Sequence, residues 1–136
     1  MNRILIVEDE EFLVMALKDN LEGEGYVVDV AQNGEEALLR INKERPSLIL
    51  LDLLMPKRDG YYVLEKVKQD PKLKDIPVIV LSNFGNDTEI KRAIQMGADD
   101  YFVKSQHMIV EVLVKVVHYL EEKKDSNDLI KKITAI

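Results

Sequence analysis

Five short apolar runs, separated by segments with helical features, constrain the fold more than any other feature of the sequence. The runs are RILIV (3–7), VVDVA (27–31), SLILL (47–51), PVIVL (77–81) and YFVK (101–104). Strands that alternate with helices of this length form a parallel sheet with helical crossovers. The sequence therefore predicts an α/β fold with five strands and five helices.

The composition of the runs also predicts their order in the sheet. The first, third and fourth runs are continuously apolar, as expected of strands covered on both faces, whereas Asp29 interrupts the second run and the fifth is short and mixed. The second and fifth strands are therefore expected at the edges. With right-handed crossovers the simplest arrangement is 2-1-3-4-5, a flavodoxin-like doubly wound sheet in a three-layer sandwich.

Local signals mark the ends of two helices. The pairs that resemble capping boxes at the start of the second and fourth helices are Asn33 with Glu36 and Asn86 with Glu89. Gly97 is expected to end the fourth helix, because glycine readily adopts the left-handed conformation found after helix ends.

The segment 108–122 predicts a helix that is apolar over an unusually wide arc. Its polar residues form one narrow stripe and are Glu111, Lys115, His118 and Glu122, and every other residue except Glu121 is apolar. A helix that covers a sheet needs an apolar arc of somewhat over ~100°, and the arc here is about twice that. The excess has two interpretations of equal weight: packing against the first helix and a folded-back C-terminal tail, or a surface for a partner or a homodimer.

Length and charge limit the function. With 136 residues, the chain is expected to form one domain at 1–123 and a tail at 124–136, without an output domain. No apolar run approaches the ~20 residues of a membrane span and no signal peptide is recognised, so a cytoplasmic location is expected. The net charge of −6 argues against direct DNA binding, and the absence of cysteine excludes thiol chemistry.

Polar side chains stand where the central strands end. Glu8 and Asp9 follow the first strand, Asp52 ends the third and Ser82 follows the fourth, while Lys104 ends the neighbouring edge strand. In an open parallel sheet, binding groups gather outside the carboxyl ends of the strands. These five side chains are therefore expected to converge on one pocket.

The chemistry of these side chains favours a metal ion and a phosphoryl group. Carboxylates held close together raise each other's pKa, and a divalent cation relieves the repulsion. All-oxygen ligands suit Mg²⁺, with Mn²⁺ as a substitute. Lys104 adds a fixed positive charge, and aspartate is a known nucleophile that forms acyl phosphates. Asp52 is therefore the expected phosphoryl acceptor.

Five segments in register resemble the receiver domain of two-component response regulators. They are ILIVEDE, LILLDLLMPKRDG, VIVLSN, GADDY and YFVK, and the resemblance runs from residue 2 to about 122. Any one segment would be a weak signal, but five in the same order and spacing are specific.

The resemblance implies a role for each matching residue. Asp52 matches the aspartate that accepts a phosphoryl group from a sensor histidine kinase or a histidine phosphotransfer protein. The implied Mg²⁺ ligands are Asp9, Asp52, the backbone carbonyl of Leu54 and, through water, Glu8. The implied phosphate-binding residues are Lys104, Ser82 and Asn83, and the implied switch residues are Ser82 and Tyr101. Phosphorylation would then alter the face made by the fourth helix, fifth strand and fifth helix.

Four positions depart from the usual family pattern. Ser105 replaces a proline that follows a cis bond; a cis bond before serine would cost ~2.5–4 kcal/mol, which favours a trans loop with Ser105 capping the fifth helix. Glu8 replaces the commoner aspartate and adds a methylene. Asn83 replaces a small residue and narrows access to the acceptor. The side chain of Leu54 is unable to orient a hydrolytic water, so a long-lived acyl phosphate is expected.

Two other functions compete with this one. A haloacid-dehalogenase-like phosphatase uses a strand-end D-x-D motif, but Leu54 stands at its second position. A pseudo-receiver that binds partners without phosphorylation would normally have lost the acid pair, the acceptor or the lysine, and all are present. The expected output is contact with a downstream protein by a stand-alone receiver, although a receiver cut from a longer regulator would have the same sequence.

The remaining aromatic and histidine residues are interpreted as structural. His107 and His118 lack metal-ligand partners at suitable spacing and are expected at a helix start and on a solvated face. Tyr61, Tyr62 and Phe84 are expected to be packing or surface groups.

Overall fold

A computed structural model of the protein describes residues 2–55, 57 and 59–121. The strands are β1 (Arg3–Val7), β2 (Val27–Ala31), β3 (Leu48–Asp52), β4 (Val78–Ser82) and β5 (Asp100–Val103). The helices are α1 (Glu11–Gly23), α2 (Gly34–Lys43), α3 (Gly60–Gln69), α4 (Asp87–Gln95) and α5 (Ile109–Leu120). None of these described helices is both long enough and apolar enough to cross a bilayer.

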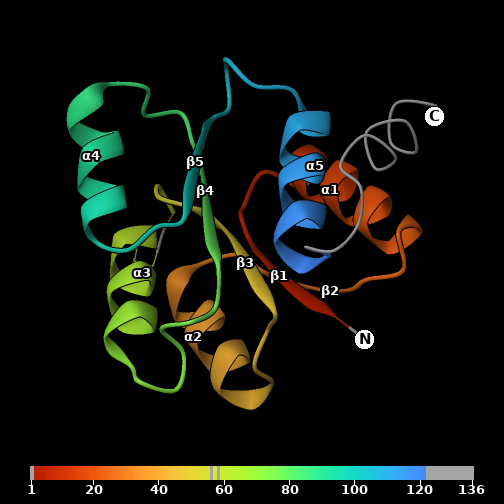
Figure 1. Ribbon diagram of the computed structural model, residues 1–136, viewed down its shortest axis with the longest axis horizontal. Helices are drawn as coiled ribbons and strands as arrows, with labels where there is room; N and C mark the ends of the chain where they lie inside the picture. Colours follow the sequence, from red (N-terminus) through yellow and green to blue (C-terminus); the bar gives the residue numbers. More distant parts are fainter. Residues whose placement is uncertain (1, 56, 58, 122–136) are drawn as a thin grey trace.

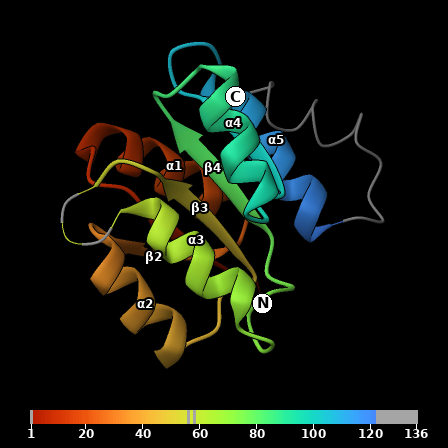
Figure 2. The same ribbon diagram turned by 90° about the vertical axis from the view of Figure 1, so that its left-hand side faces the viewer.

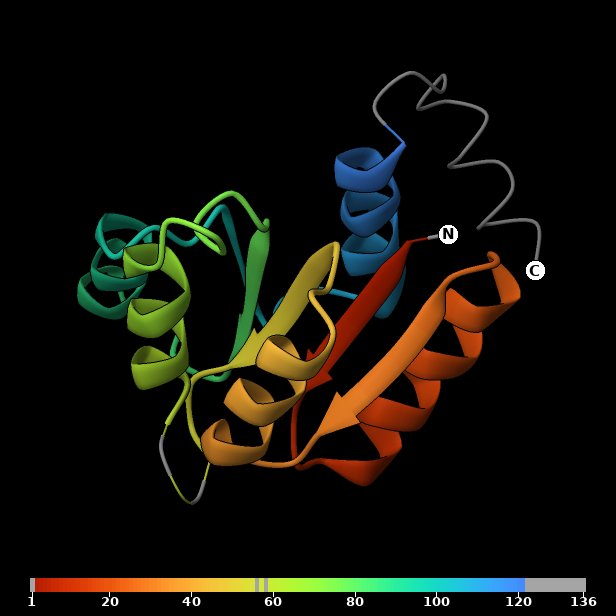
Figure 3. The same cartoon turned by 90° about the horizontal axis from the view of Figure 1, so that it is seen from below.

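The five strands form one parallel sheet in the predicted order β2-β1-β3-β4-β5. Helices α1 and α5 cover one face, and α2, α3 and α4 cover the other (Figure 1). Figure 3 shows α1 and α2 on opposite sides of the β1–β2 edge. The flavodoxin-like three-layer sandwich predicted from the alternating runs is thereby confirmed.

The central strands are apolar throughout because helices cover both of their faces. Every residue of β3 and β4 is buried. Along β3, Ile49 and Leu51 pack toward α2 and α3, whereas Leu48 and Leu50 pack toward α1 and α5. Side chains alternate between the faces of a strand, so one run of leucine and isoleucine supplies both cores.

The predicted cap of α2 is present with one difference. Asn33 Oδ1 accepts a hydrogen bond from the Glu36 amide at 2.8 Å, as a capping box requires. The Glu36 carboxylate, however, accepts from the amide of Gln32, one residue before the cap.

At the start of α4, too, only one of the two hydrogen bonds of the predicted capping box is present. Asn86 Oδ1 accepts from the Glu89 amide at 2.9 Å. The Glu89 carboxylate turns instead to the hydroxyl of Tyr61 on α3 and accepts a hydrogen bond from it. The helix ends before Gly97, whose φ of 109° lies in the left-handed region. Two neighbouring helices are thus joined by a residue that was expected only to cap one of them.

The loop from β5 to α5 corrects one prediction. The N-cap of α5 is Met108, which makes no side-chain cap, so the expectation that Ser105 caps this helix is wrong. Residues 104–107 form a separate turn, in which the amides of Gln106 and His107 both donate to the Val103 carbonyl at 3.0 Å. Among the described residues no peptide bond is cis, so the Lys104–Ser105 bond is trans.

The wide apolar arc of α5 is used largely within the fold. Its four buried residues are Val112, Leu113, Val116 and Val117. Val110, Val114 and Tyr119 are partly buried against the same core, and α1 lies alongside α5 (Figure 1). Packing against the first helix, which is one part of the first interpretation, is therefore observed. The expected tail (124–136) and Glu122 lie outside the described residues.

The outer edge of β5 is closed by side chains. The amides of Asp99 and Lys104 donate across to β4, whereas the outward-facing amides of Tyr101 and Val103 find other partners. The Tyr101 amide donates to Asp100 Oδ1 and the Val103 amide to His107 Nδ1, both at 3.0 Å. His107 therefore has a structural role that differs from the helix-start position expected from the sequence.

Gly60 allows the start of α3 to lie against the end of β3. A Cβ atom at this position would stand 2.1 Å from the Asp52 carbonyl oxygen and 2.6 Å from Leu53 Cα. Both are backbone atoms and cannot rotate away. By contrast, a Cβ at Gly23, the last residue of α1, would meet nothing within 4 Å.

We therefore expect Gly60→Ala to lower the free energy of unfolding by about 3 kcal/mol or more, the upper range for overpacking. Gly23→Ala is the matched control and should raise it by ~0.4–1 kcal/mol, because alanine restricts the unfolded chain. Guanidinium denaturation of the two variants measures both changes. Equal stabilities would contradict the close approach at Gly60.

Candidate functional site

The predicted polar side chains meet at the carboxyl edge of the sheet. The arrowheads of β3 and β4 point toward the same end of the sheet (Figure 2). Glu8 and Asp9 follow β1 at this edge, Asp52 and Ser82 are the last residues of β3 and β4, and Lys104 follows β5. The topology thus brings together residues separated by almost a hundred positions in the sequence.

Three carboxylates at this edge fit a hard divalent cation. One oxygen each of Glu8, Asp9 and Asp52 lies within 4.8 Å of the others. Glu8 and Asp52 are 1% and 5% exposed, whereas Asp9 faces solvent. An all-oxygen donor set with one open side is the environment that Mg²⁺ and Mn²⁺ favour.

Glu8 is held by the backbone on one side and by a charge on the other. Its Oε2 accepts hydrogen bonds from the amides of Asp9 and Glu10 at 3.0 and 3.2 Å. Its Oε1 is buried and, among the described residues, has no partner with hydrogen-bond geometry; Lys104 Nζ stands 2.6 Å away as an ion pair. This oxygen therefore retains the capacity to accept a hydrogen bond from a metal-bound water.

Lys104 is the positive charge of the site. Its Nζ lies 2.6 Å from Glu8, 3.1 Å from Glu10 and 3.4 Å from Asp52. Lys104 was predicted beside Asp52, but the contact with Glu10 was not. The only sequence signal was that Glu10 is the third acid of the run EDEE (8–11), and spacing alone does not tell which acid turns toward the lysine.

Burial dominates the titration of the buried acids. It raises the pKa of Glu8 from 4.5 to about 7, with the ion pair to Lys104 opposing the rise and the charge of Asp52 adding to it. Burial also raises the pKa of Asp52, against the opposing charge of Lys104. For Lys104, burial lowers the pKa, but the carboxylates of Glu8 and Asp52 outweigh it and the pKa is raised.

Asp52 is oriented by the first residues of the loop after β3. Its Oδ1 accepts from the Leu54 amide at 3.3 Å, which leaves Oδ2 facing Lys104. The Leu54 side chain is 55% exposed and offers no polar group to this edge. The Asp52 carboxylate thus has one oxygen bonded to the backbone and one beside an ammonium group.

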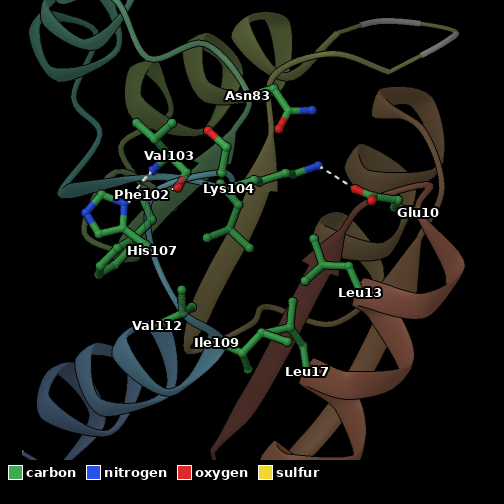
Figure 4. A pocket seen from close by; sticks show the side chains of 12 residues that line it. Glu10, Leu13, Leu17, Asn83, Phe102, Val103, Lys104, His107, Ile109 and Val112 are labelled. Atoms are coloured by element: carbon green, nitrogen blue, oxygen red, sulfur yellow. Dashed lines mark hydrogen bonds and ion pairs between the residues drawn. The ribbon is translucent and has the colours of Figure 1, made fainter.

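The two predicted switch residues are linked through Phe84. Ser82 is fully buried, and its Oγ accepts from the Phe84 amide at 3.1 Å. The Tyr101 hydroxyl donates to the Phe84 carbonyl at 2.7 Å. Asn83 is exposed and lies with Lys104 at the rim of a pocket of about 350 Å³ (Figure 4). Phe84 was interpreted as a packing group, and its backbone connects both residues.

With this geometry in place, the relationship to known proteins is clear. The sequence model of the response regulator receiver domain matches residues 4–118. The chain belongs to this family, the receiver domains of two-component response regulators.

Individual relatives agree with the family assignment. The phosphate regulon transcriptional regulatory protein PhoB of Rhizobium meliloti (strain 1021) is 39% identical over 102 residues, which make up 75% of this chain and 45% of PhoB. The chain thus spans less than half of this relative. The phosphorylated cyanobacterial phytochrome response regulator RcpA is 32% identical, with a TM-score of 0.80 over 90% of this chain and 96% of RcpA. The Mn²⁺-bound response regulator Rcp1 is 27% identical, with a TM-score of 0.81 over 92% and 98%.

The raised pKa of Glu8 predicts how stability depends on pH without a divalent cation. Between 4.5 and about 7 the folded protein holds a proton that the unfolded chain has lost. The free energy of unfolding should therefore be greatest at the acidic end of this range and fall as pH rises through about 7, by up to ~3 kcal/mol.

Glu8→Gln is the matched control, because the amide keeps the shape and does not titrate. In EDTA, denaturant midpoints at about pH 5 and pH 8 should differ less for Glu8→Gln than for the native chain. A native stability that rises over this interval would contradict the assignment.

Proposed function

We propose that this chain is a phosphoacceptor, in which Asp52 receives a phosphoryl group from a phosphohistidine of a sensor histidine kinase or a histidine phosphotransfer protein. The observation that carries the proposal is the buried Asp52 carboxylate, with Lys104 Nζ 3.4 Å away and two further acids beside it. The phosphorylated state of the related RcpA supports it.

The transfer needs positioning and neutralisation of charge more than further covalent chemistry. An oxygen of Asp52 forms the bond to phosphorus while the phosphorus–nitrogen bond breaks, and its electron pair stays on the imidazole. Lys104, already beside Oδ2, offsets the charge of the phosphoryl oxygens. The hydroxyl of Ser82 and the amide of Asn83 are the other phosphate-binding groups in this proposal.

The acidic cluster is proposed to hold Mg²⁺, with Mn²⁺ as a substitute. Its ligands would be Asp9, Asp52, the backbone carbonyl of Leu54 and, through water, Glu8, whose Oε1 is available for that contact. When bound, the cation supplies positive charge against the anionic donor and the acids. The Mn²⁺-bound Rcp1 supports this part of the proposal.

The structural change that follows phosphorylation is proposed to begin at Ser82 and Tyr101. When Ser82 turns its hydroxyl to the phosphoryl group, the Phe84 amide loses its acceptor and the contact between Phe84 and Tyr101 is disturbed. The face formed by α4, β5 and α5 then changes for a downstream protein or for a second copy of the chain.

In this role the chain is a signalling phosphoacceptor in the cytoplasm, with only the intrinsic gain and loss of phosphate as its chemistry. It acts by contact with proteins, without direct DNA binding. One observation favours the alternative of a static pseudo-receiver: Lys104 already has three carboxylate partners among the described residues, so the charge of the lysine is compensated without a phosphoryl group.

Phosphorylation of the native chain separates these alternatives. In Mg²⁺ and acetyl phosphate, intact-mass spectrometry should show one added phosphoryl group, and peptide mapping should place it on Asp52. Asp52→Asn, which keeps the size of the side chain, should remain unmodified. Beryllium fluoride with Mg²⁺ should shift the amide resonances of residues 82–84 and 101 in the native chain only. A native chain that stays unmodified and unshifted would favour the static module.

The apolar side chain of Leu54 predicts a slow loss of the phosphoryl group. We expect the acyl phosphate to persist well beyond seconds, because no side-chain polar group at this position orients a water. Leu54→Asn should shorten the half-life roughly fivefold, the value of one hydrogen bond of about 1 kcal/mol to the attacking water. Leu54→Met is the control and should leave the half-life unchanged. A native half-life of seconds would contradict the prediction.

A further inference from the structure

Among the described residues, the carboxylates that pair with Lys104 belong to Glu8, Asp52 and Glu10, and of these Glu10 alone lies outside the carboxylate cluster. Its carboxylate lies 3.1 Å from Lys104 Nζ, and Figure 4 shows the two side chains facing each other across the pocket between α1 and α5. The cluster of carboxylates close enough to share a cation comprises Glu8, Asp9 and Asp52 and leaves Glu10 out. Glu10 therefore acts on the lysine.

Within the described part of the chain, the Glu10 side chain has no hydrogen bond or ion pair other than the one to Lys104. It occupies the N-cap of α1, a position where a short polar side chain usually accepts a hydrogen bond from the first turn. The Glu10 side chain makes no such bond. The Glu10 amide instead donates a hydrogen bond to Glu8 Oε2, and the Glu10 carboxylate extends to Lys104.

The three partners of Lys104 differ in how easily they can leave. Glu8 and Asp52 have side-chain exposures of 1% and 6% and are fixed by backbone amides. Glu10 has 61% exposure, so solvent can take over its hydrogen bonds at little cost. An anion that arrives at Lys104 therefore displaces Glu10 first.

We infer that Glu10 is a displaceable counter-ion, which occupies Lys104 until a phosphoryl group or a phosphoryl-like anion replaces it. Glu10 thereby weakens the hold of the resting site on anions and slows phosphorylation. It is a positioning residue, because it acts through Lys104 and does not touch the transferred group. The inference rests on the proposed function of Asp52. It adds a residue that sets the rate of phosphorylation and the affinity of the site for anions.

The test compares Glu10→Gln with Glu11→Gln. Glu11 is the next residue and begins α1, is also exposed and loses the same charge, but it has no ion pair to Lys104. In Mg²⁺, calorimetric titration with beryllium fluoride should show roughly three- to tenfold tighter binding to Glu10→Gln, the range expected when a partly exposed ion pair no longer competes. Glu11→Gln should match the native chain.

Two further measurements separate this role from a general effect of charge. The affinity for Mg²⁺ alone should stay within about twofold in Glu10→Gln, since Glu10 lies outside the cation cluster, whereas loss of a cation-binding charge would weaken it. The rate of phosphorylation by acetyl phosphate should rise together with the affinity for beryllium fluoride. Glu10→Ala should give the same gains in affinity and rate, because they come from loss of the carboxylate and not from the glutamine amide.

The outcomes distinguish the inference from the proposed function. Unchanged or weaker anion binding in Glu10→Gln, with a native chain that binds beryllium fluoride, overturns the inference and leaves the phosphoacceptor role standing. An equal gain in Glu11→Gln also overturns it, because the effect would then be one of net charge. A native chain that binds no beryllium fluoride and gains no phosphoryl group overturns the proposed function and the inference with it.

Discussion

The ammonium group of Lys104 is the interaction on which the carboxyl edge of the sheet depends. It lies within 3.4 Å of three carboxylates, two of them almost fully buried. A buried charge without a partner is strongly destabilising, and removal of one member of such a pair typically costs about 3–5 kcal/mol. The Lys104 ammonium group offsets the charge of the buried carboxylates in the folded protein. The proposed phosphoryl transfer requires the same group. Stability and reactivity therefore compete for one side chain.

The position of Lys104 at the end of a strand follows from the structure of the sheet. The central strands are covered on both faces, so their sequences are apolar up to the residue at which they emerge, and polar side chains begin there. Gly60 then lets the chain fold back against Asp52 without a clash. Asp52 is thus held between a buried strand and a helix start, and 5% of its surface is exposed.

The apolar runs and the right-handed crossover rule were enough to predict the strands and their order, whereas contacts that depend on the direction of a flexible side chain were missed. Strand limits were correct to about one residue, because each apolar run ends where polar residues begin. Asn33 was recognised as a cap because that bond is local. Ser105 was wrong as a cap, since the turn after β5 delays α5 to Ile109. The bonds made by Glu10 and His107 join parts of the chain whose proximity only the fold determines.

The capped amides of β5 have a consequence for how copies of this chain can meet. An edge strand normally offers a row of free N–H groups on which a foreign strand can add. Here Asp100 and His107 take up the amides of Tyr101 and Val103, and Tyr119 donates its hydroxyl to the Asp99 carbonyl. Extension of the sheet from one molecule into the next would first have to break these bonds. Addition of a foreign strand at this border is thus disfavoured, and a contact made there must rely on side chains.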